Sequence, residues 1–147
     1  PFSTKALQAI EPMVRLRRLN LEHCKELVGS ALLHVPVGVE DLAVTRCRFE
    51  PGAGRLLATR FPKLRRLRVW EAAWLDDESF AALLRLPFLE DLTVGDCTRL
   101  TATHLDAILA ARRLTTLDAT RSSCLTDEQA AELVAKRPDL KVTRKVW

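Results

Sequence analysis

The chain has 147 residues, of which 48% are hydrophobic and 29% are charged, and its formal net charge is +4. This composition is ordinary for a globular protein, and the length allows one domain with a sizeable core. The charge is well below that of a dense nucleic-acid-binding surface, and no apolar run approaches the roughly 20 residues of a membrane span. We therefore expect neither nucleic acid nor a bilayer as the partner.

The first predicted element is a helix in residues 3–10, STKALQAI. It looks like the helical half of a strand–helix unit whose strand is missing. The chain also begins with Pro1, in the middle of this pattern. We expect residues 1–147 to form a single domain that is the C-terminal fragment of a longer protein.

A nine-residue motif then returns five times, with starts 23 or 25 residues apart, and a partial sixth copy begins at Leu140. The copies are LRRLNLEHC (16–24), VEDLAVTRC (39–47), LRRLRVWEA (64–72), LEDLTVGDC (89–97) and LTTLDATRS (114–122). Apolar residues occupy the first, fourth and sixth positions, and the alternation from the fourth to the sixth predicts a short strand. Self-similarity at this period predicts a solenoid of stacked units.

A helix is predicted after each motif. In LTDEQAAELVAKRP (125–138), Thr126 and Gln129 stand at the spacing of a capping box, and Leu133 and Val134 belong to the expected buried stripe. In LDDESFAALLRLP (75–87), Asp76 is the expected cap. Repeated strand–helix units predict a parallel sheet with helices on its other side. Because helices are wider than strands, the sheet is expected to form the concave face.

The cysteines favour core packing over chemistry. Cys24, Cys47 and Cys97 share the ninth motif position, where a free cysteine acts as a small hydrophobic residue. Unpaired thiols indicate a reducing compartment inside the cell, the cytoplasm or the nucleus. Cys124 lies off this register, so we expect it to be partly exposed. No phosphate loop, metal-ligand spacing or nucleophile motif is present, so we expect no enzyme activity, no cofactor and no metal.

Charges alternate in sign from one motif to the next. At the second position the order is Arg17, Glu40, Arg65, Glu90, and at the third it is Arg18, Asp41, Arg66, Asp91. In-register parallel strands would place these side chains about 5 Å apart, where opposite charges attract. We interpret the second-position ladder as structural.

A binding surface is predicted around Trp70. Arg66, Arg68 and Trp70 alternate along one strand and therefore share a face. Tryptophan and arginine are enriched at binding hot spots, and the neighbouring positions are small, which leaves space beside the ring. The alternative is that a loop or a missing segment covers Trp70. The candidate partner-binding residues are Trp70, Arg68, Arg66, Asp91, Asp118, Asn20 and Glu22, and a polar rim is expected from Arg46, Glu71, Asp96 and Arg121.

The motifs resemble the leucine-rich repeats, in the cysteine-containing subclass that reads roughly LxxLxLxxC before a loop and a helix. The resemblance rests on LRRLNLEHCKEL, LEDLTVGDCTRLTATHLDAIL and LDATRSSCLTDEQAAELV and covers nearly the whole chain. It departs at Ala72 and Ser122, and CRFEPGAGRLLA is similar to the glycine-containing repeats of the ribonuclease-inhibitor kind. The family implies a right-handed α/β solenoid of about five repeats plus partial ends, with a parallel concave sheet and convex helices.

The resemblance also suggests a function. Proteins of this subclass are often F-box proteins, the substrate receptors of cullin-type ubiquitin ligases, so ligase components are possible partners by analogy, although these residues contain no F-box. We expect a non-enzymatic protein–protein interaction module that acts as a substrate receptor or scaffold through its concave face. The alternative is a structural subunit of a large ribonucleoprotein or cytoskeletal assembly, held through the basic C-terminal stretch that includes Arg137, Lys141, Arg144 and Lys145.

Overall fold

The computed structural model describes residues 3–145, which form an α/β structure. In chain order the elements are α1 (Thr4–Ile10), β1 (Arg18–Asn20), the 3-10 helix η1 (Gly29–His34), β2 (Asp41–Ala43), α2 (Ala53–Arg60), β3 (Arg66–Trp70), α3 (Asp77–Leu84), β4 (Asp91–Gly95), α4 (Leu105–Ala110), β5 (Thr116–Asp118), α5 (Asp127–Lys136) and β6 (Lys141–Thr143). Each strand falls within or just after the start of a motif copy, as the alternation predicts.

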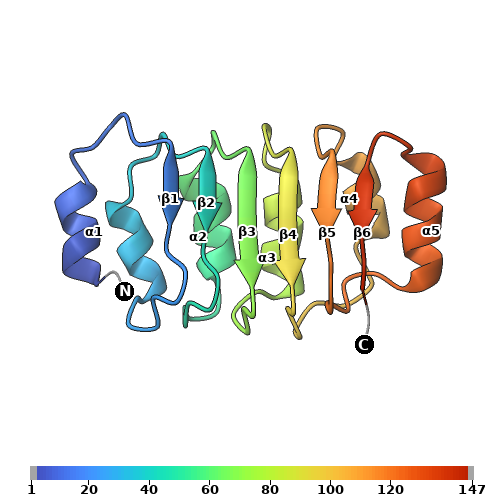
Figure 1. Ribbon diagram of the computed structural model, residues 1–147, viewed down its shortest axis with the longest axis horizontal. Helices are drawn as coiled ribbons and strands as arrows, with labels where there is room; N and C mark the ends of the chain where they lie inside the picture. Colours follow the sequence, from blue (N-terminus) through green and yellow to red (C-terminus); the bar gives the residue numbers. More distant parts are fainter. Residues whose placement is uncertain (1–2, 146–147) are drawn as a thin grey trace.

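The six strands form one parallel sheet in the order β1-β2-β3-β4-β5-β6 (Figure 1). The helices lie behind the sheet, and α1 and α5 stand at its two ends (Figure 1). The prediction of a parallel sheet with helices on its other side is confirmed. We call the helix-free side the open face; it is the face that the sequence predicts to be concave.

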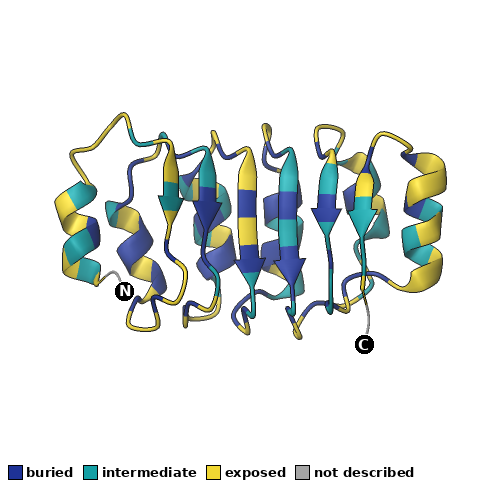
Figure 2. Ribbon diagram, viewed as in Figure 1, coloured by how far each residue is buried: buried dark blue, intermediate teal, exposed yellow. Residues whose placement is uncertain are grey.

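The register places equivalent motif positions side by side. Leu19, Leu42, Leu67, Leu92 and Leu117 are successive cross-strand partners, and Val142 continues the row on β6. The four leucines inside the sheet are fully buried, whereas the outermost one, on β1, is half-buried (Figure 2). Full burial of one such side chain stabilises the fold by about 1.5–3 kcal/mol. The leucine row therefore both fixes the register and supplies much of the core.

Local signals cap α3 and α5 as expected, whereas the helix expected after the first motif is the 3-10 helix η1. The Asp76 carboxylate accepts the amide of Ser79 at 2.9 Å, which caps α3. Thr126 and Gln129 form the reciprocal capping box of α5. The prediction for Val134 is wrong, because this side chain is 52% exposed. Among residues 3–145, α5 is the last helix of the row, and no described helix packs on its outer flank (Figure 1).

Arg137 has a role that its place in a basic stretch does not suggest. The side chain is only 3% exposed, and its guanidinium pairs with Asp139 at 2.7 Å. It also donates to the carbonyl oxygens of Leu114 at 2.8 Å and Ala111 at 3.3 Å, in the turn that leads from α4 into β5. Hydrogen bonding to the guanidinium lowers the pKa of the Asp139 carboxyl. Arg137 thus fastens this turn instead of forming part of a solvated basic surface.

Replacing Arg137 tests this role. Arg137→Met removes the donors of buried carbonyl groups, so the free energy of unfolding is expected to fall by about 3 kcal/mol. Urea denaturation followed by circular dichroism measures the change. The control is Lys136→Met, at an exposed neighbour whose ion pair with Glu132 lies on the helix surface; its expected effect is below about 0.5 kcal/mol. Equal effects of the two substitutions would contradict the structural role of Arg137.

Candidate protein-binding face of the sheet

The open face is built from the motif positions between the buried leucines. The third position runs across the sheet as Arg18, Asp41, Arg66, Asp91, Thr116 and Lys141, and the fifth as Asn20, Ala43, Arg68, Thr93, Asp118 and Thr143. At the seventh position, Trp70 on β3 stands opposite Gly95 on β4. The in-register alignment therefore brings the predicted site residues of β3, β4 and β5 onto one surface.

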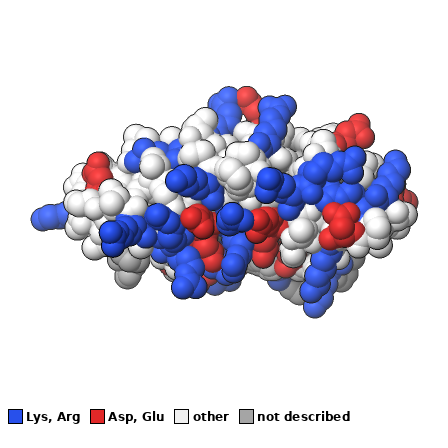
Figure 3. All heavy atoms as spheres, turned by 90° about the horizontal axis from the view of Figure 1, so that it is seen from above, with Lys and Arg blue, Asp and Glu red and all other residues white. Residues whose placement is uncertain are grey.

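Opposite charges pair across the strands. Glu40 lies between Arg17 at 3.4 Å and Arg65 at 3.9 Å, and Arg65 also pairs with Glu90 at 2.5 Å. The predicted second-position ladder is confirmed. Positive and negative side chains alternate along the molecule when it is viewed onto the edge where the strands begin (Figure 3). Each exposed pair contributes about 0.2–1 kcal/mol, so the ladder matters more for register than for total stability.

Arg66 and Arg68 share one acidic partner. The Asp41 carboxylate lies 3.9 Å from the guanidinium of Arg66 and 3.3 Å from that of Arg68. Arg68 thus reaches diagonally toward β2, and its own cross-strand neighbour, Ala43, is fully buried. Both arginine side chains are still half or more exposed. They are oriented by Asp41 and remain accessible from the open face.

Trp70 is half-buried, and its ring lies against Gly95. A Cβ atom at Gly95 would collide with the ring, so only glycine allows this position. The guanidinium of Arg121 stands 5.6 Å from the ring centre and donates to Asp96 at 2.5 Å. The sequence predicts open space beside Trp70, but the ring itself fills the space over Gly95 of β4. What the open face presents is a fixed, partly exposed aromatic surface.

The other predicted site residues divide by environment. Asp91 is half-buried, and burial raises the pKa of its carboxyl, while Arg66 and Arg68 act in the opposite direction. Asn20 and Asp118 accept the backbone amides two residues further on, at 2.8 Å and 2.9 Å. Such local bonds shape the ends of β1 and β5, a role that sequence reasoning missed although asparagine and aspartate are typical of these turns. Glu22 is exposed.

The polar rim sits on an unusual backbone. The eighth motif residues His23, Arg46, Glu71, Asp96 and Arg121 all have positive φ values between 52° and 59°. This left-handed conformation turns the chain sharply away from each strand. Arg46 donates to Glu71 at 2.5 Å, and this hydrogen bond lowers the pKa of the Glu71 carboxyl. The rim side chains are therefore held in pairs beside Trp70.

The basic C-terminal residues are not equivalent. Lys141 and Lys145 are exposed. Arg144, in contrast, donates to the carbonyl oxygen of Leu125 at 2.8 Å and pairs with Asp127 at the start of α5. The prediction that Arg144 faces a partner must be corrected, because its guanidinium is already used to hold the loop before α5.

All four cysteines are buried, and none of them forms a disulfide bond within residues 3–145. The expectation that Cys124 is partly exposed is wrong, because its side chain is fully buried in the hydrophobic core. Burial raises the pKa of Cys47 to about 11 and that of Cys97 to about 12. In residues 3–145, no group of three or more His, Cys, Asp or Glu side chains is arranged to hold a metal ion.

A scan against protein-family models finds none that matches the chain, and a search of curated proteins finds no matching sequence. Within the described range, no helix is both long enough and apolar enough to cross a membrane. The function is therefore proposed from the geometry of the chain itself.

Gly95→Ala tests how the ring of Trp70 is held. The added methyl group collides with the ring, so we expect the ring to be displaced and acrylamide quenching of tryptophan fluorescence to increase. The Trp70→Phe variant, which lacks this tryptophan, shows how much of the fluorescence and its quenching comes from Trp70. Thr93→Ala, on the same strand, is the control and is expected to leave quenching unchanged. Unchanged quenching in Gly95→Ala would contradict the contact between Trp70 and Gly95.

Thiol reactivity and pH test the burial of the cysteines. The native protein is expected to react slowly with Ellman's reagent, and all four thiols should react rapidly in denaturant. Because the folded-state pKa values of Cys47 and Cys97 are raised, the neutral thiols stabilise the fold below about pH 9, and this contribution is lost as the pH rises toward 11–12. Rapid labelling of Cys124 in the native protein would contradict its burial.

Proposed function

We propose that the chain is a solenoid of the leucine-rich repeat type, similar to the cysteine-containing subclass. Three observations support this: the sequential parallel sheet, the leucine row formed by equivalent motif positions, and the helices on one side only. Cys24, Cys47 and Cys97 are buried at one motif position, as packing between stacked units requires. Attachment to a cullin-type ligase is a proposal that follows from the resemblance alone.

We propose that this solenoid is a non-enzymatic interaction module that binds a protein partner on its open face, as a substrate receptor or scaffold. The observation that carries the proposal is the partly exposed ring of Trp70. Trp70 stands on β3, one of the inner strands of the sheet, and its ring is held between Gly95 and Arg121. A rigid aromatic ring loses little conformational entropy when a partner covers it. Trp70 is therefore the proposed anchor of the contact.

The charged side chains around Trp70 would set the specificity of the contact. Arg66 and Arg68 lie 3.9 Å and 3.3 Å from Asp41 and leave half or more of their side chains exposed, so their guanidinium groups can donate hydrogen bonds to a carboxylate of the partner. Asp91 and Asp118 follow on β4 and β5 and present the opposite sign. This order favours a partner whose own charges change sign along the direction of the strand row.

The alternative is a structural subunit held by its basic C-terminal end. Fewer basic side chains are available for such a contact than the sequence suggests. Lys141 and Lys145 are exposed on and beside the edge strand β6, which supports such a contact. Arg144 is engaged within the chain. Two lysines give a weak electrostatic contact at physiological salt, so we favour the open face.

Affinity purification of the protein from its own cells tests the two proposals. If the open face binds the partner, the Trp70→Ala variant should no longer co-purify the proteins that bind the unaltered chain. Removal of an aromatic anchor that the partner buries typically costs 2 kcal/mol or more of binding free energy, a roughly 30-fold loss of affinity. Mass spectrometry identifies the retained proteins, and circular dichroism checks the fold. Phe88→Ala, at another exposed aromatic ring, is the control and should retain them.

The same purification with Lys141→Glu and Lys145→Glu combined tests the alternative. If this double variant no longer co-purifies the partner proteins while Trp70→Ala still co-purifies all of them, binding at the open face is contradicted and the C-terminal contact is supported.

A further inference from the structure

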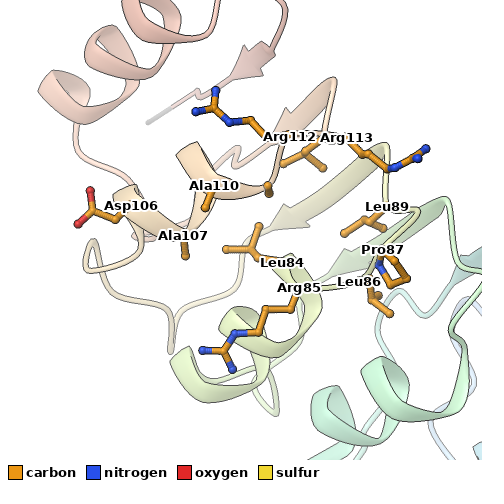
Figure 4. Close-up of a pocket in the computed structure, with 12 residues that line it drawn as sticks. Leu84, Arg85, Leu86, Pro87, Leu89, Asp106, Ala107, Ala110, Arg112 and Arg113 are labelled. Carbon is orange, nitrogen blue, oxygen red and sulfur yellow. The ribbon is translucent and has the colours of Figure 1, made fainter.

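A groove opens on the helix side of the molecule, between the end of α3 and α4 (Figure 4). Its volume is about 590 Å³, within the range of about 300–1,000 Å³ that is usual for ligand pockets. The side chain of Leu84, at the end of α3, faces Ala107 and Ala110 of α4 across the groove (Figure 4). Leu86, Pro87 and Leu89 extend this apolar lining toward β4. The groove lies on the other side of the sheet from Trp70.

The groove exists because the two helices that flank it do not close together. On the other side of α3, Gly54 of α2 sits directly against Ser79, and a Cβ atom there would collide with that serine. Helix α4 has only six residues and offers alanine methyl groups where longer side chains would fill the gap. The space between α3 and α4 is thus a consequence of short side chains on a short helix.

Hydrogen bonds from Arg137 hold the segment after α4 that forms one wall of the groove. The buried guanidinium of Arg137 donates to the carbonyl oxygens of Ala111 at 3.3 Å and Arg112 at 3.5 Å, both in the segment that lines the groove. Asp139 holds the guanidinium in place. A wall that is ordered before binding loses little entropy when a ligand arrives.

The rim of the groove carries more positive than negative side chains. Arg85, Arg112 and Arg113 contribute to its lining, are exposed, and make no ion pair within the described residues; their guanidinium groups point outward at the rim (Figure 4). Arg65 and Arg68, in contrast, each have an acidic partner, Glu90 at 2.5 Å and Asp41 at 3.3 Å. Asp106 is the one acidic residue in the lining.

We propose that this groove binds an acidic peptide segment of a partner protein, with aliphatic side chains on the alanine and leucine floor and carboxylates on Arg85 and Arg112. Arginine side chains are long enough to swing toward a carboxylate at the rim. A peptide fits better than RNA, because the lining residues include no aromatic ring and the ring beside them, Phe88, already contacts Arg113. The site is separate from the open face and does not depend on its function.

Fluorescence anisotropy with three labelled probes tests the proposal: the peptide EELLEELD, its neutral analogue QQLLQQLN and an eight-residue oligouridine. The acidic peptide should bind, and the neutral one should bind more weakly. Arg85→Gln and Arg112→Gln combined should weaken binding of the acidic peptide by about tenfold, since two exposed charge pairs are lost. Arg15→Gln and Arg48→Gln combined remove the same charge from exposed arginines elsewhere and should leave affinity unchanged.

A second pair of variants tests the floor. Ala110→Leu should fill the groove and weaken binding at least as much as the arginine variant, whereas Ala131→Leu, at an exposed position of α5, should not. Thermal denaturation checks that each variant folds, and if Ala110→Leu does not, the arginine pair decides. No binding of the acidic peptide, equal binding by the arginine variant and its control, or tighter binding of oligouridine would overturn the proposal.

Discussion

In-register parallel pairing of the six strands is the constraint on which the rest of the structure depends. It aligns the leucines of successive motifs into one buried row, and a shift by one residue would turn them toward the open face. The same register brings Arg65 beside Glu40 and Glu90, and sets Trp70 opposite Gly95. Core, charge ladder and candidate site are therefore three consequences of one alignment.

The sequence predicts what is periodic in this fold and misses what depends on a single contact. The strands, the caps at Asp76 and Thr126, and the second-position charge ladder follow from local chemistry repeated at a fixed spacing. The burial of Arg137 is not visible in a basic stretch, because it depends on carbonyl oxygens more than 20 residues away. Cys124 is buried although it lies off the motif register, because the motif period carries no information about such a position.

The arrangement of the residues on the open face follows only in part from the sequence, for the same reason. Alternation along β3 correctly placed Arg66, Arg68 and Trp70 together, since their faces follow from period two. It did not show that the ring fills the space over Gly95, or that Arg144 is held inside the chain. The two sides of the sheet also differ in charge. On the open face, Asp41 pairs with Arg66 at 3.9 Å and with Arg68 at 3.3 Å, whereas the three arginines that line the groove between α3 and α4 form no ion pair within the described residues.

A photo-crosslinking amino acid placed at position 93 tests recognition by the open face most directly. This position lies between Arg68 and Asp118 in the register, within the proposed contact. The account predicts that a bound partner is crosslinked from position 93 and not from position 131, on the exposed side of α5. A partner that is crosslinked from position 131 and never from position 93 would contradict it.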